Sequence, residues 1–291
     1  MTNPRIPFQM SSERPKINPP DGKPLIVQIV VNVEYWPFDQ TMPRQALTHP
    51  HGADPQPDIP NYSWMEYGLR CGMPRLLKLF ADRKVPVSVN LNASVIDQYP
   101  SLAVAMREAG WNFQGHGMFQ RILHKEDDEE GVINAVIQKI TDFTGVHPRG
   151  WMGPGYAETY DSPDYLKAAG VDYILDWVLD DLPCWVTTKH GPLLSLPYGF
   201  ELNDAMLYAV EKQNSPEVLQ RFKDTLRTFD DELGDQPRVL TLATHPHQCA
   251  VPHRFPYYVD VLDLLLDRDD TIFLTGNEIT DWYTGEVPPD A

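Results

Sequence analysis

The chain has 291 residues, 42% of them hydrophobic, and a formal net charge of −17. This length and composition suit one large core, because α/β barrels of roughly 250 residues form single domains. The excess of acidic side chains repels phosphate backbones and anionic lipids, which argues against nucleic acid or a membrane as a partner.

Cysteine content and the chain ends indicate a reducing compartment. The three cysteines form no C-x-x-C pair, which argues against a disulfide framework and a structural zinc site; they are Cys71, Cys184 and Cys249. Residues 1–22 are polar and rich in proline and lack the apolar core of a secretory signal. No apolar run approaches the roughly 20 residues of a membrane helix. We therefore expect a cytoplasmic protein with a flexible polar segment at 1–22, one domain at 23–285 and a C-terminal tail at 286–291.

The first half of the chain alternates extended and helical patterns. The run from Leu25 to Val33 is rich in Val and Ile, as in a strand buried on both faces. A proline-rich loop is expected at 43–62, and Ser63 is the expected N-cap of the helix that follows. The later predicted elements are a helix at 64–83, a strand at 85–91, a helix at 99–109, a strand at 112–115 and a helix at 132–143.

The second half continues this alternation. The predicted elements are a strand at 149–152, a helix at 161–169, strands at 173–177 and 193–197, a helix at 216–233, a strand at 239–244, a helix at 255–267, a strand at 271–274 and a helix at 277–283. Strands that are separated by helices favour a parallel sheet over a sandwich. The sequence therefore predicts an α/β fold, a distorted barrel of seven or eight βα units.

Polar, ionisable and aromatic residues recur where the predicted strands end. They are Glu34, Asn90 and Asn92, His116, Arg149 with Trp151, Asp176 with Trp177, and His245 with His247. Any one of them could be a helix cap or a surface group. Because the active sites of such barrels lie at the C-terminal ends of the strands, we expect most of these residues to share one pocket.

A glutamate and a histidine in one pocket suit hydrolysis of an amide. One group takes a proton from the attacking water, and the other gives a proton to the departing nitrogen. Arg149 could hold a carboxylate or carbonyl by a bidentate contact, could orient Glu34, or could form a structural ion pair.

Six short motifs resemble one known family. They are Val31-Asn32-Val33-Glu34, Glu66-Tyr67-Gly68-Leu69-Arg70, Gln114-Gly115-His116-Gly117, Arg149-Gly150-Trp151-Met152-Gly153-Pro154, Leu196-Pro197-Tyr198 and Leu242-Ala243-Thr244-His245-Pro246. Together they resemble the polysaccharide deacetylase superfamily, over nearly the whole chain. The Glu-Tyr-Gly and Arg-Gly-Trp stretches resemble its atypical branch, which contains cofactor-independent allantoinases and cyclic imide hydrolases.

The resemblance bears on a metal ion. In the metal-dependent deacetylases the base carboxylate is followed by a metal-binding Asp, and two histidines four residues apart complete the ligands. Here the base position is Glu34, but Tyr35 follows it, and the residue four after His116 is Gln120. A phenol and an amide are poor ligands for zinc, so no cofactor is expected. A substitute zinc site would have to use His116, His247 and Glu34, although His245 and His247 should face opposite ways if the segment is extended.

These observations predict a hydrolase of a small, cyclic amide, imide or ureide, with Glu34 as general base and His245 as general acid. His116 and Arg149 are the other expected catalytic residues. The expected substrate-binding residues, which include aromatic walls, are Tyr35, Trp36, Asn90, Gln120, Trp151, Gly153, Trp177 and His247. Oxyanion donors could be the backbone N–H groups after Tyr35 or Gly153, or the side chains of Asn32 and Gln120.

Two other functions remain open from the sequence. One is a metal-dependent deacetylase of N-acetyl sugars, and the other is a barrel that binds ligands without catalysis. The partner expected in the favoured case is a small amide or imide, and the resemblance to small-ring hydrolases implies a possible homo-oligomer.

Overall fold

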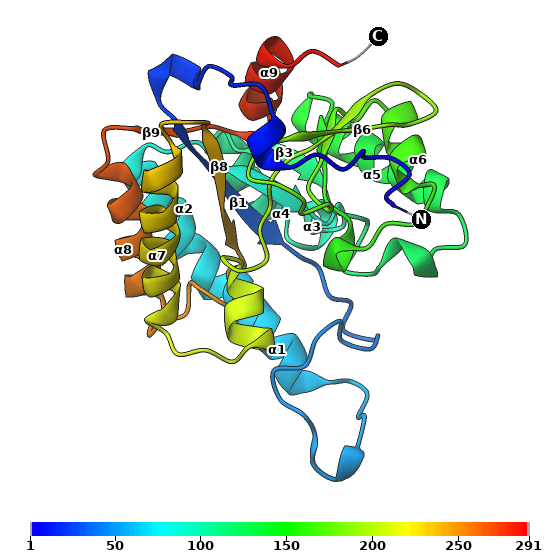
Figure 1. Ribbon diagram of the computed structural model, residues 1–291. Helices are drawn as coiled ribbons and strands as arrows, with labels where there is room; N and C mark the ends of the chain where they lie inside the picture. The colour runs from blue at the N-terminus through cyan, green and yellow to red at the C-terminus, as the bar shows by residue number, and fades with distance from the viewer. Residues whose placement is uncertain (1, 290–291) are drawn as a thin grey trace.

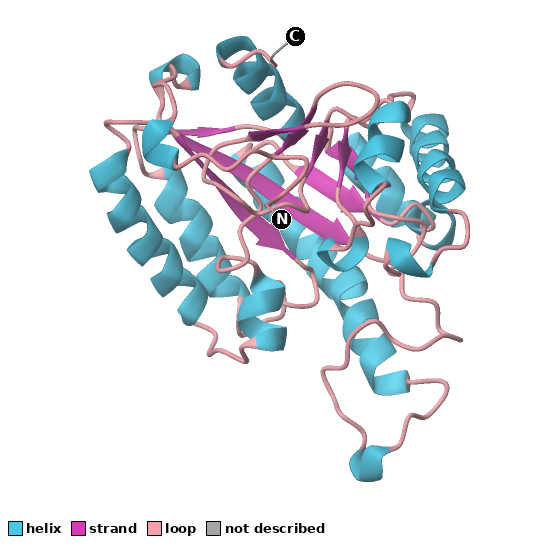
Figure 2. Ribbon diagram, turned by 45° about the vertical axis from the view of Figure 1, so that its right-hand side comes forward, coloured by secondary structure: helices cyan, strands magenta, loops and turns pink. Residues whose placement is uncertain are grey.

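A single curled sheet runs through the computed structural model, which describes residues 2–289 (Figures 1 and 2). Its strands are β1 (Leu25–Val33), β2 (Ser88–Leu91), β3 (Asn112–Gly115), β4 (Gly150–Trp151), β5 (Tyr173–Ile174), β6 (Cys184–Val186), β7 (Leu193–Ser195), β8 (Arg238–Thr244) and β9 (Thr271–Phe273). The helices are α1 (Ile59–Tyr67), α2 (Met73–Arg83), α3 (Val95–Gln98), α4 (Pro100–Glu108), α5 (Glu129–Thr144), α6 (Ser162–Ala168), α7 (Glu217–Glu232), α8 (Phe255–Leu266) and α9 (Gly276–Glu286).

The strand order makes this sheet an open barrel. The order is β6-β7-β5-β4-β3-β2-β1-β8, with β9 beside the first three residues of β1, and every pair is parallel except β6 with β7. Within residues 2–289, β8 pairs with neither β6 nor β7, so the barrel does not close there. Two hydrogen bonds span part of this gap, from the Val239 N–H to the Asp181 carbonyl (2.8 Å) and from Thr241 Oγ1 to the Pro197 carbonyl (2.6 Å). The predicted distorted α/β barrel is confirmed, although β6 had no prediction.

The central strand, β1, contributes to two separate cores. All nine of its residues are buried. Leu25, Val27 and the later odd-numbered residues pack in the large core that contains the side chains of the surrounding helices. Ile26 and Val30 pack in the smaller core inside the curl, with residues such as Tyr173. Alternate residues of a strand face opposite sides, so even-numbered positions of β1 point into the barrel.

The helix predicted at 64–83 begins earlier and is interrupted. It starts at Ile59, where the Asp58 side chain accepts a hydrogen bond from the Asn61 N–H, so Asp58 and not Ser63 is the cap. Pro60 lies in the first turn, where a missing N–H costs little. A π-helical turn at Gly68–Gly72 separates α1 from α2. The predicted helix was therefore wrong at its start and missed this turn.

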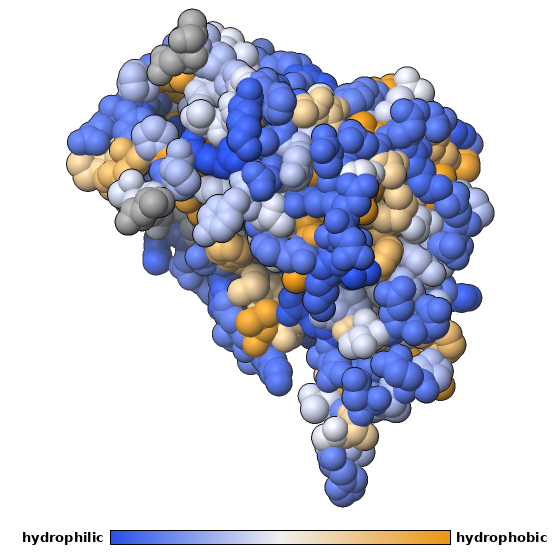
Figure 3. All heavy atoms as spheres, turned by 90° about the vertical axis from the view of Figure 1, so that its right-hand side faces the viewer, coloured by the Kyte–Doolittle hydropathy of each residue, from blue (hydrophilic) through white to orange (hydrophobic). Residues whose placement is uncertain are grey.

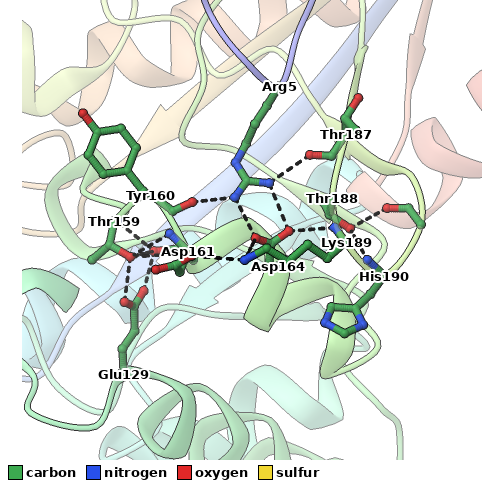
Figure 4. A network of polar contacts seen from close by, with 12 residues as sticks. Arg5, Glu129, Thr159, Tyr160, Asp161, Asp164, Thr187, Thr188, Lys189 and His190 are labelled. Carbon is green, nitrogen blue, oxygen red and sulfur yellow. Dashed lines mark hydrogen bonds and ion pairs between the residues drawn. The ribbon is translucent and has the colours of Figure 1, made fainter.

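Two arginines hold the N-terminal segment against the body of the protein: Arg14 forms an ion pair with Asp180, and Arg5 makes the contacts shown in Figure 4. The guanidinium of Arg5 makes a bidentate contact with Asp164 at 2.8 and 3.0 Å and donates to the Thr187 carbonyl at 2.9 Å. Ile6 and Ile17 from the same segment are buried. At the other end of the chain, Glu286, the first residue of the tail predicted at 286–291, is the last residue of α9. Residues 290–291 of that tail, like Met1, lie outside the described residues.

The loop after β1 stands out from the rest of the molecule (Figures 1 and 3). It runs from the end of β1 to Ile59 and contains a short 3₁₀ turn at Pro50–Gly52, and most of its side chains are exposed. Figure 1 shows this loop at one end of the barrel and α9 at the other. No helix within residues 2–289 combines the length and apolar character needed to cross a bilayer.

Candidate active site

Strand periodicity brings the three main predicted residues together. Gln28 and Asn32 of β1, Asn90 of β2 and Gln114 of β3 are all buried polar residues; Asn90 donates to Asn32 Oδ1 at 2.9 Å and Gln114 donates to the Tyr173 hydroxyl inside the curl. Glu34 and His116 lie two residues beyond Asn32 and Gln114, so they keep the inward direction as the strands end.

His245 completes this group from β8. Its ring Nε2 lies 3.6 Å from Glu34 Oε1, and both residues are less than a tenth exposed. Both residues and His116 line a cavity of about 400 Å³ at the C-terminal end of the strands. Trp36, Gln120 and His247 also line it, as does Asn32.

His245 is fixed by a residue that the sequence analysis did not identify. Asp204 accepts a hydrogen bond from the ring Nδ1 of His245 at 2.7 Å and another from its backbone N–H at 2.7 Å. Burial lowers the pKa of His245, but the negative charges of Asp204 and Glu34 outweigh it, so the pKa is raised. The imidazole is therefore held as a cation with its Nε2–H directed toward Glu34.

Glu34 has a different balance of forces. Burial raises its pKa, while the charge of His245 and a hydrogen bond from Trp36 Nε1 to Oε2 (2.7 Å) oppose that rise. The net pKa is above the ordinary value for a glutamate. A carboxylate with a raised pKa is a stronger base than a free one, which suits proton abstraction from water.

His116 is a neutral acceptor. Its Nδ1–H donates to the Met152 carbonyl at 2.7 Å, which fixes the tautomer and leaves a lone pair on Nε2. Burial lowers the pKa of His116 to about 4. Nε2 is buried and has no hydrogen-bond partner among the described residues. This nitrogen can therefore accept a hydrogen bond from a water molecule or from a ligand.

His247 shares the cavity with His245. The segment 245–247 is a turn, not an extended strand, and the two ring centroids are 5.8 Å apart. The expectation that they face opposite ways was wrong, because residues two apart share a face even on an extended segment. His247 lies edge-on between Trp36 and Trp64, at centroid distances of 5.6 and 4.6 Å, and burial keeps its pKa well below the ordinary value.

The π-helical turn at Gly68–Gly72 lets this histidine turn approach the helix. A Cβ atom on Gly68 would lie 2.4 Å from the His247 backbone nitrogen, and one on Gly72 would lie 2.5 Å from the Pro246 carbonyl oxygen. Only glycine fits both positions without movement of the backbone. Such π turns occur often at functional sites, where they adjust the path of a helix.

Arg149 lies away from this cavity, which corrects the expectation that it shares the site. It precedes β4 at the opposite, N-terminal end of the barrel. There it forms ion pairs with Asp172 and Asp281, both at 2.7 Å. The strand that was predicted from residue 149 begins at Gly150, and a residue that enters a strand cannot lie at its C-terminal end.

Five predicted substrate-binding residues also lie outside the cavity lining. Tyr35 packs edge-on against Tyr99, and Asn90 lies beneath Asn32, to which it donates. Trp151 is buried in the large outer core beside Gly115. Gly153 donates its N–H to the Asp176 carboxylate, and Trp177 donates to Glu158. These five residues therefore lie behind the residues that line the cavity, and the N–H of Gly153 already has Asp176 as its acceptor.

The donors present do not suit a divalent metal ion. No group of three or more His, Cys, Asp or Glu side chains within residues 2–289 has a geometry that could hold one. His116 offers one free nitrogen, but Nδ1 of His245 is bonded to Asp204 and Glu34 accepts from Trp36. At the two positions where metal-dependent relatives would carry ligands, the chain has the phenol of Tyr35 and the amide of Gln120, which bind zinc poorly.

Comparison with known proteins defines the class. Residues 58–174 match the family model described as polysaccharide deacetylase. A Schizosaccharomyces pombe protein assigned as a polysaccharide deacetylase is 25% identical over 260 residues, which is 78% of this chain and 77% of that protein. The family resemblance is thus confirmed, and deacetylases are hydrolases of carbon–nitrogen bonds other than peptide bonds.

Two solved structures resemble this chain over nearly its whole length. The crystal structure of Puue allantoinase superposes with a TM-score of 0.87 at 22% identity, and the match covers 100% of both chains. A protein from Pseudomonas aeruginosa PAO1, assigned as a probable polysaccharide deacetylase, superposes with a TM-score of 0.82 at 24% identity over 96% of this chain and 97% of that one. At these identities the structures show a shared fold.

Proposed function

We propose that the chain is a hydrolase that opens the C–N bond of a small cyclic amide, imide or ureide. The observation that carries this proposal is the buried array Asp204–His245–Glu34, with the histidine held as a cation beside a carboxylate of raised pKa. A cavity of about 400 Å³ suits a small ring better than a polymer. The similarity to Puue allantoinase across the whole chain supports the same class of substrate.

In the proposed mechanism, Glu34 takes a proton from a water molecule as its oxygen attacks the substrate carbonyl carbon. His245 then donates the proton on Nε2 to the departing ring nitrogen, and the C–N bond breaks. The products are a carboxylic acid and an amine or amide in one opened chain. Because Glu34 and His245 are 3.6 Å apart, the proton on Glu34 can return to His245 and restore the resting state.

Two further groups contribute to this reaction in the proposal. His116 accepts a hydrogen bond from the attacking water through its free Nε2, which orients the water beside Glu34. The carboxamide of Gln120 donates to the developing oxyanion. Of the donors expected from sequence, none follows Gly153, because Pro154 has no N–H, and Asn32 donates to the Tyr198 hydroxyl and the Thr244 carbonyl. One well-placed oxyanion donor contributes about 3 kcal/mol.

A panel of substrates tests the proposal. Allantoin, dihydropyrimidines, succinimide-type imides and chitooligosaccharides are assayed side by side with the wild type and with Glu34→Gln. We expect turnover of one cyclic class, reduced by orders of magnitude in the variant while its thermal unfolding is unchanged. Turnover of none of the rings, or near-wild-type activity of the variant, would contradict the proposal.

A metal-dependent N-acetyl sugar deacetylase is the second candidate, favoured by the match of residues 58–174 to the polysaccharide deacetylase family. The two candidates differ in their need for a cofactor. We propose that no divalent metal is required, because the donor set is poor, and expect activity to survive EDTA. Activity that EDTA abolishes and zinc restores, on a chitooligosaccharide, would establish the second candidate.

We further propose that the protein is cytoplasmic and acts on a small molecule without a nucleic-acid or membrane partner, as a homo-oligomer. The net charge of −17 and the absence of a disulfide among the described residues, where all three cysteines are free, support the first two points. Fractionation of cells and light scattering of the purified protein test the compartment and the oligomeric state.

A further inference from the structure

Gln248 lines the cavity and has no role in the mechanism above. It follows His247 in the turn after β8, and its side chain is almost fully buried, with 1% of the residue exposed. Its backbone is engaged, because the N–H donates to the His245 carbonyl and the carbonyl accepts from Arg254. Its side-chain Nε2 is buried and has no hydrogen-bond acceptor among the described residues. Proteins rarely bury an amide donor without an acceptor, so this group indicates a ligand atom.

Arg44 supplies a second donor to the same cavity from the loop after β1. Within residues 2–289 its guanidinium forms no ion pair and no hydrogen bond, although the chain has 41 acidic residues and only 24 basic ones. Arg44 lines the cavity together with Glu34, His245 and His247. An unpaired guanidinium at the mouth of a pocket suits a carbonyl or carboxylate oxygen, which it can bind by two N–H groups.

Arg121 provides the contrast. It lines the same cavity, but its Nε lies 3.5 Å from the Glu126 carboxylate, and it donates to the Lys125 carbonyl. Its charge and donors are therefore already engaged. Arg121 therefore forms an ion pair within the protein at this rim, whereas the guanidinium of Arg44 stays available to a ligand in the cavity.

We propose that Gln248 and Arg44 form a subsite for a second carbonyl group of the substrate, distinct from the carbonyl at the bond that is cleaved. This inference rests on the proposed function and narrows its substrate to rings that carry two carbonyls, such as imides and ureides. A lactam has one carbonyl and leaves this subsite empty.

Ligand binding tests the subsite separately from catalysis. Succinimide and 2-pyrrolidinone are five-membered rings that differ by one carbonyl, and their dissociation constants are measured by titration calorimetry. The variants are Gln248→Met, which keeps the length of the side chain, Arg44→Met, and Arg121→Met as the matched control. We expect the wild type and the control to prefer succinimide about tenfold or more, the preference that one or two hydrogen bonds to a buried donor supply. We expect Gln248→Met and Arg44→Met to reduce this ratio several-fold.

The outcomes separate this inference from the proposed function. An unchanged ratio in both Gln248→Met and Arg44→Met overturns the subsite, even if the wild type hydrolyses imides. A ratio that falls in both variants supports the subsite, even if the wild type hydrolyses no ring, in which case the proposed hydrolase fails alone. Thermal unfolding of each variant checks the fold, and because Arg44 is exposed, its variant remains informative if Gln248→Met unfolds.

Discussion

Replacement of Asp204 by asparagine tests the role of His245 as general acid without changing the other residues of the site. Asp204 accepts both from the ring Nδ1 of His245 and from its backbone N–H, each at 2.7 Å. Asparagine keeps one oxygen, which can still accept from the backbone, but it loses the negative charge and presents an NH₂ group in place of the second oxygen. We expect the side chain of His245 to stay in place and to lose its proton.

The size of the effect follows from the forces on His245. Burial lowers its pKa, and the charge of Asp204 is the largest influence that raises it. Without that charge burial dominates, and the imidazole is neutral at pH 7. A positioned general acid contributes about 10²- to 10⁴-fold to a rate. We therefore expect kcat/KM to fall by about 10²- to 10⁴-fold, which corresponds to roughly 3–5 kcal/mol at the transition state.

The assay compares two substrates over pH 5–9. One has a poor leaving nitrogen, and the other is an activated anilide whose nitrogen needs no proton as it leaves. Asp204→Asn should affect the first substrate far more than the second and move the alkaline limb of the profile to lower pH. Asp231→Asn, which removes an exposed aspartate from α7, is the control for the change in net charge. Equal losses on both substrates with an unmoved alkaline limb would mean that Asp204 only supports the fold.

Three other predictions concern the same array and its surroundings. Activity of the wild type should rise with pH through the raised pKa of Glu34, above 4.5, and fall through the raised pKa of His245, above 6.5; a single limb in the profile would refute the pairing. Gly68→Ala, whose Cβ would meet the backbone of His247, should cost about 1–3 kcal/mol in thermal unfolding and most of the activity, whereas full activity would show that the turn can adjust. Arg149→Met should leave kcat unchanged and lower the free energy of unfolding by about 1 kcal/mol or less, because its ion pairs are partly exposed; a large fall in kcat would return Arg149 to the site.

The sequence was sufficient to predict the residues that strands position. Glu34, His116 and His245 each come directly after a buried strand, and parallel strands end at one rim. The period of two along each strand then selects inward-facing positions, which the buried amides Asn32 and Gln114 mark two residues earlier. These regularities are local in sequence, so they needed no knowledge of how the loops fold.

Residues on loops and turns were beyond that reasoning. Asp204 follows β7 by nine positions, in a segment with no strand or helix pattern, and only the folded chain brings it to His245. The direction of His247 was wrong because residues two apart on a strand share a face, and Arg149 was misplaced because it begins the strand predicted at 149–152 and does not end it.

The charges of the site fit a neutral ring better than a charged ligand. Two carboxyl groups, Glu34 and Asp204, contact the one imidazole whose pKa is raised, His245, while burial lowers the pKa of both His116 and His247. The inner site therefore has two acidic groups beside one imidazole that favours the cation, in a protein whose net charge is −17. A substrate anion would meet repulsion from both, and Arg44 at the mouth supplies only one positive charge to offset it. Hydrolysis creates a carboxylate in place of the neutral ring, so the same field that admits the substrate favours departure of the product.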